Sequence, residues 1–406
     1  MAKRVSRLLV CAGGLLALTL SHWAAAADSK QAVSKGVAKQ LQAAQKASQE
    51  KKYSECISQA EAAKGVAGRT SYDDFIIARL LGFCYVRTNN YGAAFGPLEA
   101  ALNSGMLPAE DVPTQVRGLA QIAYQQKNYD KAIELANRSI KGGFANDDMY
   151  TIVAQSLYLK GDNRAAQSFL NNLISAQERG GQAPKEQTLL LVQSACLKLK
   201  DNACVTSTFE KLVHHYPKDQ YWQNLLATLM NSGANDKTML HIYRLSSEVN
   251  AMSGSTYLEM AQLAIEAGLP GEAQSAMETA IARKAITEAR EVASSQRLLA
   301  SAKAAAATDR ASLPKQDADA AKKPTGELDY KVGAAWMSYG QYPQAVAAMA
   351  RGIAKGALKN PAEAQLMLGI AQLRAGDKAA AEKSLKAVKG DATLERLASL
   401  WALRAQ

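Results

Sequence analysis

The sequence predicts an all-α protein in which helical hairpins follow one another along the chain. Alanine, leucine, glutamine and lysine dominate the 406 residues and aromatic residues make up only 6%, a composition that favours helices over sheets. There are 10 prolines, and no long strand-like alternation of Val, Ile and Thr. A short turn motif also returns along the chain at nearly regular intervals, which is typical of a repeat array.

The repeat is clearest at the turn inside each hairpin. The triplets KKY, NNY and KNY end at Tyr53, Tyr91 and Tyr129, two successive steps of 38 residues. Related triplets follow as GDN at 161–163, KDN at 200–202, GLP at 268–270, GQY at 340–342 and GDK at 376–378. One such motif has little weight, but eight in tandem predict a repeated pair of helices.

Small residues recur at two fixed positions around these turns. Three residues after the turn stand Cys56, Ala94, Ala132, Ala166, Ala273, Ala345 and Ala381, with Val205 in the copy at 200–202. Upstream of the turn stand Gly82, Ala120, Ala154, Ala261, Gly333 and Gly369. Two helices that cross at close range need a small side chain where their backbones approach, because a larger one forces them apart.

This pattern resembles the tetratricopeptide repeat (TPR), which places a small residue in each of two antiparallel helices. The copies that match best are residues 75–108, 254–287, 326–359 and 362–389, and Pro217 fits the closing proline of the copy that begins near Glu186. The resemblance implies an all-α fold: a right-handed α-solenoid of about nine to ten TPR-like helical hairpins with a terminal capping helix.

The predicted organisation has five parts. They are a signal peptide (1–27), a TPR-like solenoid (28–309), a flexible linker within a degenerate repeat (310–326), a C-terminal pair of TPR hairpins (327–390) and a capping helix (391–406). The linker is expected because Pro314 and the polar run KQDADAAKKPTGE cannot bury an apolar stripe. Leu397 and Trp401 are expected on the buried side of the capping helix, and a helix within 34–53 is expected to cap the other end.

The first 27 residues have the layout of a secretory signal peptide. A basic start precedes the apolar stretch LLVCAGGLLALTL, and AAAA at 24–27 supplies small residues for cleavage after Ala27. A retained membrane anchor is the alternative, and it is disfavoured because the apolar stretch is short for a bilayer. We therefore expect an exported, periplasmic protein. Removal of the three basic residues of the signal lowers the formal charge from +11 to +8.

Neither charge nor motif spacing predicts catalysis. Basic residues are scattered among acidic ones, so no nucleic-acid site is expected. Of the four histidines, His22 lies in the signal, His214 and His215 are adjacent and His241 is isolated, so no metal site is predicted. No phosphate-binding loop, catalytic residue or cofactor site is predicted either. A non-enzymatic protein is expected, with an unrecognised enzyme as the alternative.

Four cysteines remain after signal removal, in a compartment where disulfides persist. Cys56 and Cys84 lie on consecutive helices of neighbouring hairpins, and Cys196 and Cys204 flank one turn. Either pair, Cys56–Cys84 or Cys196–Cys204, can form a disulfide. Because cysteine also suits a small packing position, the sequence leaves bridges and free thiols open.

A binding surface follows from the TPR resemblance, because the first helix of each TPR hairpin lines the concave face. Nine residues of three successive copies fall at inward positions, and we call them the first-helix row. They are Arg79, Phe83, Arg87, Arg117, Gln121, Tyr124, Thr151, Gln155 and Tyr158. Aromatic area flanked by Arg and Gln suits an extended or helical segment of a partner protein. The alternative is that these are ordinary half-exposed side chains.

A narrower resemblance covers nearly the whole mature chain. The stretches LLGFCYV…NNYGAAFGPLEAALNSGMLP, YPKDQYWQNLLATL, GLPGEAQSAMETAI and GIAKGALKNPAEAQLMLGIAQLRAGDKAAAEKSL are similar to periplasmic TPR proteins that accompany TonB-type energy-transduction systems. This similarity implies a non-catalytic scaffold that contacts protein partners in the cell envelope, possible TonB-system components among them. A scaffold for envelope biogenesis or polysaccharide secretion is the main alternative. The degenerate repeat near residue 300 departs from the pattern.

Overall fold

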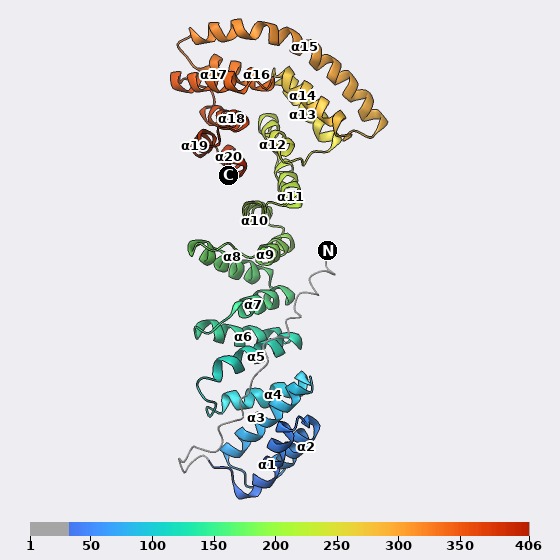
Figure 1. Ribbon diagram of the computed structural model, residues 1–406, viewed down its shortest axis with the longest axis vertical. Helices are drawn as coiled ribbons and strands as arrows, with labels where there is room; N and C mark the ends of the chain where they lie inside the picture. Colours follow the sequence, from blue (N-terminus) through green and yellow to red (C-terminus); the bar gives the residue numbers. More distant parts are fainter. Residues whose placement is uncertain (1–31, 406) are drawn as a thin grey trace. The chain divides into compact units, whose positions relative to one another are not determined.

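The computed structural model describes residues 32–405, and all regular secondary structure among these residues is α-helical (Figure 1). The predicted signal peptide, 1–27, lies outside this range. None of the helices in the described range is both long and apolar enough to cross a bilayer. The chain divides into two compact units at Lys200–Asp201, which we call unit 1 and unit 2. This boundary lies well before the predicted one at 310–326.

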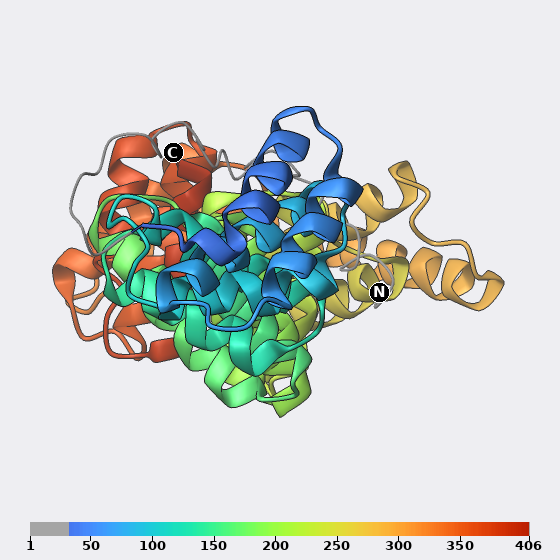
Figure 2. The same ribbon diagram turned by 90° about the horizontal axis from the view of Figure 1, so that it is seen from below.

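Unit 1 contains nine of the helices in the described range, and successive helices pair as antiparallel hairpins. They are α1 (Lys35–Gln49), α2 (Tyr53–Lys64), α3 (Ser71–Arg87), α4 (Tyr91–Asn103), α5 (Val112–Gln125), α6 (Tyr129–Lys141), α7 (Asp147–Leu159), α8 (Asn163–Arg179) and α9 (Glu186–Leu199). Figure 2 turns the molecule so that the first hairpins, in blue, face the viewer. The N-terminal capping helix expected within 34–53 is α1.

Unit 2 contains the remaining helices of the described range. They are α10 (Asn202–His215), α11 (Asp219–Met230), α12 (Asp236–Glu248), α13 (Gly254–Glu266), α14 (Pro270–Ala282), α15 (Ala289–Ala321), α16 (Glu327–Ser338), α17 (Tyr342–Lys355), α18 (Pro361–Arg374), α19 (Lys378–Lys386) and α20 (Ala392–Ala405). Helix α20 packs on α18 and α19 and also touches α12, so this unit folds back on itself. Leu397 and Trp401 are buried on α20, as predicted.

Each predicted turn triplet adopts the same backbone. Its first residue takes a positive φ, and this holds for Lys51, Asn89, Lys127, Gly161, Lys200, Gly268, Gly340 and Gly376. A left-handed residue ends the first helix of a hairpin because it turns the next N–H back onto that helix. In the second hairpin the N–H of Asn90 donates to the carbonyl of Tyr85 at 2.9 Å. Glycine adopts this conformation without a Cβ penalty at Gly161 and Gly376.

The middle residue of the triplet starts the second helix. The side chains of Asn90, Asn128, Asp162 and Asp377 accept hydrogen bonds from backbone N–H groups three residues later, at 2.9–3.3 Å. Such a cap stabilises a helix by about 1 kcal/mol because it satisfies a donor that has no partner within the helix. The triplet therefore stops one helix and begins the next within three residues.

The small residues lie where the two helices of a hairpin meet, as predicted. All seven small residues that follow the turns are fully buried, from Cys56 to Ala381. A methyl group added at Gly82 would lie 2.4 Å from Cδ2 of Leu98, and one at Gly333 would lie 2.5 Å from Cγ of Met349. The backbones approach so closely at these points that the partner side chain occupies the place of a Cβ.

We predict that Gly82→Ala lowers the free energy of unfolding of unit 1 by about 1–3 kcal/mol, because Leu98 must leave its buried site. Gly96→Ala is the matched control: Gly96 is exposed within α4 and its added methyl group would meet nothing within 4 Å. That control should be neutral or stabilise α4 by about 0.5–1 kcal/mol. Urea unfolding followed by circular dichroism measures both. Equal effects would contradict the close approach at Gly82.

The predicted linker at 310–326 is wrong over most of its length. Residues 310–321 are roughly the last third of α15, a single helix of 33 residues, and only residues 322–326 lie between helices. Pro314 does not break α15: it lies on the exposed side, and the carbonyl that it leaves unbonded belongs to exposed Arg310. Ala302, Ala306, Leu313 and Ala320 form a buried stripe along the helix.

Polar contacts from the following hairpin hold α15 in place. The carboxylate of Asp317 accepts from Trp336 Nε1 at 3.0 Å and pairs with Arg351. Lys355 Nζ donates to the carbonyls of Ala320 and Ala321 at 2.9 and 3.0 Å, so its positive charge caps the carboxyl end of α15. The charged residues of this segment led to the prediction of a solvated linker. Several of its polar groups instead contact side chains of α16 and α17.

Lys355→Met tests this correction, because it removes the ammonium group and keeps the aliphatic stem. We expect faster amide hydrogen exchange over 313–321 and a loss of about 1–3 kcal/mol. Three charge-assisted hydrogen bonds are lost, two to carbonyls at the end of α15 and one to the buried carboxylate of Asp329. Lys322→Met is the control, because the exposed Lys322 side chain pairs with Asp319 and with no other residue in the described part of the chain. Unchanged exchange over 313–321 in Lys355→Met would rule out this anchor.

Candidate functional site

The first-helix row lies on α3, α5 and α7 of unit 1. Its side chains are half-buried, except for Arg87, which is exposed. Four of its members reach a neighbouring helix pair. Arg79 pairs with Asp111 at 3.1 Å, Arg117 Nη1 donates to the Phe144 carbonyl at 2.9 Å, Arg87 Nε donates to Tyr53 Oη at 3.0 Å, and Tyr124 Oη donates to Gln155 Oε1 at 2.7 Å.

These contacts give the row a role that its sequence did not reveal. The guanidinium groups of Arg79 and Arg117 bond to the next helix pair along the chain, so they fix the stacking as well as lining the face. Thr151 bonds to its own helix through the carbonyl of Asp147. Gln121 and Tyr158 have no hydrogen bond among the described residues and are available to a partner.

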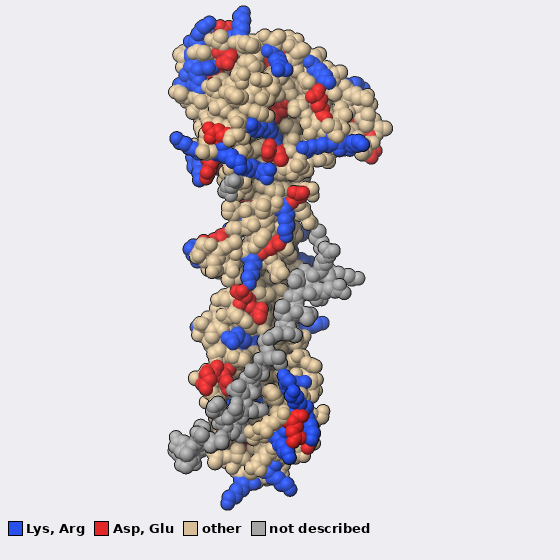
Figure 3. Space-filling view, viewed as in Figure 1, with Lys and Arg blue, Asp and Glu red and all other residues tan. Residues whose placement is uncertain are grey.

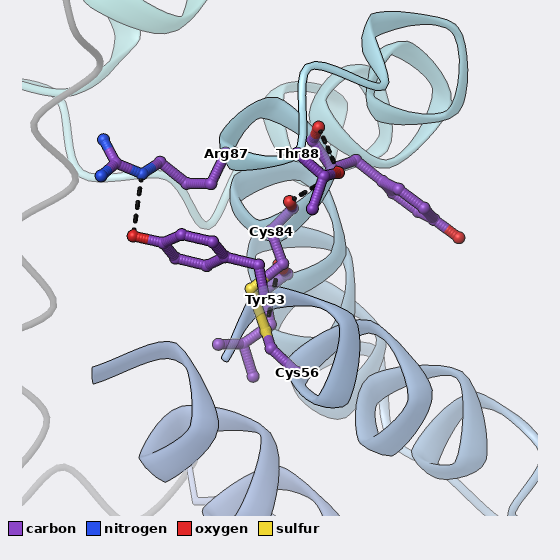
Figure 4. The surroundings of a disulfide bond; sticks show 7 residues. Tyr53, Cys56, Cys84, Arg87 and Thr88 are labelled. Carbon is purple, nitrogen blue, oxygen red and sulfur yellow. Dashed lines mark hydrogen bonds between the residues drawn. A yellow bond between two sulfur atoms is a disulfide. The ribbon is translucent and has the colours of Figure 1, made fainter. Parts of the chain in front are cut away.

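A disulfide lies beside the start of the row (Figure 4). Cys56 of α2 and Cys84 of α3 are bonded, which is the bridged form of one of the two pairs that the sequence left open. Arg87 stacks over the Tyr53 ring, and Phe83 meets the same ring edge-on with centroids 6.2 Å apart. A cross-link over 28 residues stabilises a fold by about 3–4 kcal/mol in the loop-entropy account. Cys196–Cys204, whose members lie on either side of the unit boundary, stays a prediction.

Unit 2 contains a cavity of about 680 Å³, which we call the unit 2 cavity. Its walls come from α12, the end of α13, α15, α16 and the start of α18. Apolar side chains line much of it, including Leu240, Leu263, Leu269 and Val332. Exposed residues such as Lys237 and Leu328 form part of its lining, so it opens to solvent. Its volume falls within the range of small-molecule sites.

A chain of polar groups lies at the wall of this cavity, and we call it the buried network. Arg244 makes two hydrogen bonds to the carboxylate of Glu272, both at 2.7 Å. Its Nη1 also lies 3.0 Å from Nδ1 of His241, and Nε2 of His241 lies 3.4 Å from Oε1 of Glu363. Tyr330 bonds to Glu363 as well. The network therefore joins α12, α14, α16 and α18.

The protonation states in the network follow from burial and these contacts. Burial lowers the pKa of His241, and a neutral ring that accepts from Arg244 at Nδ1 and donates to Glu363 from Nε2 fits both bonds. The hydrogen bond from His241 lowers the pKa of Glu363, so Glu363 is a carboxylate. Burial raises the pKa of Tyr330, which keeps its hydroxyl protonated as a donor. The network thus contains two carboxylates and one cation.

Sequence reasoning missed this network. It treated His241 as isolated and proposed no role for Glu272, Tyr330 or Glu363, because helices distant in the sequence bring them together. The only local signal was the spacing of His241 and Arg244, which stand three residues apart among the apolar residues of α12. His214 and His215 do end a helix, as their position suggested. Within the described residues no group of three or more His, Cys, Asp or Glu side chains could hold a metal ion.

The lowered pKa of His241 predicts a pH dependence of stability. The unfolded chain binds a proton near pH 6.5 that the folded chain resists, so unit 2 should lose stability as pH falls below about 6.5. The slope is at most about 1.4 kcal/mol per pH unit, for one proton. The tryptophans of the mature chain, Trp222, Trp336 and Trp401, all lie in unit 2. Urea unfolding followed by their fluorescence, at pH 5.5–7.5, therefore measures this unit.

His241→Gln should flatten this dependence, because glutamine can keep both hydrogen bonds but does not titrate. His214→Gln, at an exposed position, controls for the loss of a histidine elsewhere. Glu272 and Glu363 also have lowered pKa values, through Arg244 and His241 respectively, so a further loss below about pH 4.5 should remain in both variants. Equal slopes in His241→Gln and the parent chain above pH 5.5 would contradict the assignment.

Comparison with known proteins assigns no family and no activity to this chain. No protein-family profile and no curated protein matches the chain. It is similar to the solved structure of a tetratricopeptide repeat protein from Parabacteroides merdae, with 13% identity over 74% of this chain and 99% of that chain, at a TM-score of 0.32. The TPR2AB domain of yeast Sti1, solved with pHSP90, is similar at 15% identity over 73% of this chain and 100% of that chain, with a TM-score of 0.26. Because these TM-scores are low, the assignment of TPR-like hairpins rests on the turns and packing positions of the chain itself.

Proposed function

We propose that this protein is a non-catalytic scaffold for protein–protein interaction in the periplasm, and that unit 1 binds its partner through the first-helix row. The observation that carries the proposal is the set of contacts that link successive helix pairs: Arg79–Asp111, Arg117–Phe144 and Tyr124–Gln155. They hold half-buried aromatic, amide and guanidinium groups in fixed positions along three stacked first helices. A preorganised surface of this kind binds a partner segment without a large ordering cost.

The surface chemistry favours a protein partner. Tyrosine and arginine are the side chains that contribute most to protein interfaces, and the row offers both. Lys and Arg are interspersed with Asp and Glu on the face seen in Figure 3, without a wide basic field that would suit nucleic acid. The hydrogen bonds of the row are structural: Tyr124 bonds to Gln155, Arg117 to a backbone carbonyl, and Arg87 to the hydroxyl of Tyr53. None of them joins a nucleophile to a base.

The cellular role is the finer part of the proposal. The signal-like residues 1–27 support export to the periplasm, where the Cys56–Cys84 disulfide would persist. The resemblance in sequence motifs supports an accessory of a TonB-type system that transduces energy to the outer membrane. Envelope biogenesis or polysaccharide secretion is the alternative scaffold role. N-terminal sequencing of the exported protein should begin at Asp28, and a start at Met1 would contradict signal cleavage.

Photocrosslinking in living cells tests the surface and the partner together. A benzophenone amino acid replaces Gln121, which lies in the row and makes no hydrogen bond among the described residues. The matched control carries the probe at Arg138, an exposed residue on the outer helix α6 of the same hairpin. We expect a TonB-system component to be captured at Gln121 and not at Arg138, as identified by mass spectrometry.

Other outcomes of this experiment would each overturn a different part of the proposal. Capture of a different envelope protein at Gln121 alone would keep the scaffold and discard the TonB role. Capture at Arg138 alone would show that the second helices bind the partner and that the first-helix row does not. Release of a modified cell-wall fragment by the purified mature chain would replace the scaffold with an enzyme.

A further inference from the structure

The unit 2 cavity has the chemistry of a binding site that is separate from the first-helix row. Among its lining residues are five carboxylates and four cationic side chains. One of those cations, Arg244, is already neutralised by two hydrogen bonds to Glu272, which lies outside the lining. The cavity is therefore net negative, although the whole chain carries a formal charge of +11.

Among the described residues, the cavity carboxylate of Glu363 makes no ion pair with a lysine or arginine, and Lys237 attracts it only without direct contact. The only ion-pair contact of Glu363 within the described residues is His241, at 3.4 Å, and burial keeps that imidazole neutral. The Glu363 side chain is 18% exposed, and that exposed part lies in the cavity lining. His241 and Tyr330 occupy two of the roughly four lone-pair positions of a carboxylate. The others can accept from a ligand, and a buried charge without a counter-ion is costly.

The apolar side chains of the cavity wall determine the shape and polarity expected for the rest of the ligand. Leu240 and Val332 are buried beside the network, Leu263 is half-buried, and Leu328 is an exposed leucine, with 38% of its surface accessible. These side chains favour a hydrocarbon body that runs from Glu363 toward the opening. A ligand that is cationic at one end and apolar along its length meets both requirements.

We propose that the unit 2 cavity binds an alkylammonium group, with the charge held by Glu363 and the hydrocarbon chain packed on the leucines of the wall. Two sources carry this chemistry: a free organic amine and the lysine side chain of a partner protein. The Glu363 carboxylate accepts hydrogen bonds from the ammonium, and Tyr330 and His241 hold that carboxylate in position.

Isothermal titration calorimetry on the full mature chain tests the proposal with simple probes. We expect n-pentylamine to bind one site per chain and n-pentanol, its neutral match, to bind at least about tenfold more weakly, because it lacks the charge. Nα-acetyl-lysine amide and Nα-acetyl-norleucine amide form the second matched pair. Binding of both amines indicates that a partner lysine fits, whereas binding of n-pentylamine alone indicates a free amine. If neither amine binds more tightly than its neutral match, the proposal is overturned.

Variants locate the site. Glu363→Gln keeps the shape of the side chain and removes its charge, so it should weaken n-pentylamine binding at least about tenfold. That variant touches the buried network and its folding must be checked, so substitutions at two exposed positions make the same test.

Leu328→Lys should weaken binding about two- to fivefold, with Leu328→Gln as its control for lost apolar area. Lys237→Gln should strengthen binding by a similar factor, because it removes a competing cation from the opening. Binding that all four variants leave unchanged would place the amine elsewhere and overturn the proposal.

Discussion

Close backbone contact inside each hairpin is the constraint on which the rest of the structure depends. At Gly82, Gly333 and Gly369 the partner helix fills the space of a Cβ, and fully buried small residues occupy the matching position after the turn. This approach sets the distance between the two helices of a pair. Because each pair then packs on the next, the same distance fixes how side chains such as Tyr124 and Gln155 meet between pairs.

The hairpins could be predicted because their determinants are local. A turn triplet contains its own stop signal, a residue at positive φ, and its own start signal, the Asn or Asp cap. Small residues at fixed offsets from that triplet then identify the helix crossing. All of this lies within about 34 residues, the length of one repeat, so composition and spacing are enough to read it. The positions of the first-helix row came from the TPR resemblance, in which the first helix of each hairpin lines the concave face.

What the sequence could not reveal depends on contacts between distant segments. The polar run after Pro314 resembles a linker, yet Asp317 bonds to Trp336 and Lys355 caps the end of the same helix. From sequence alone, a charged residue is taken to be exposed to solvent unless its partner is known. The partners of this segment lie some 20 to 40 residues further along the chain. The buried network has the same origin, because Glu363 lies far along the chain from the histidine that it contacts.

Unit 2 differs from unit 1 in a way that explains where a cavity can form. In unit 1 each helix packs mainly on its sequence neighbours, so the core between two hairpins is filled by the leucines and alanines of the repeat. In unit 2 the long α15 and the return of α20 to α12 bring α12, α14, α16 and α18 around one centre. Charged groups line that centre, although packed apolar side chains would stabilise it at least as well as a buried ion pair. Stability alone therefore does not explain why Arg244, His241 and Glu363 are buried there, whereas binding of a charged ligand would explain it.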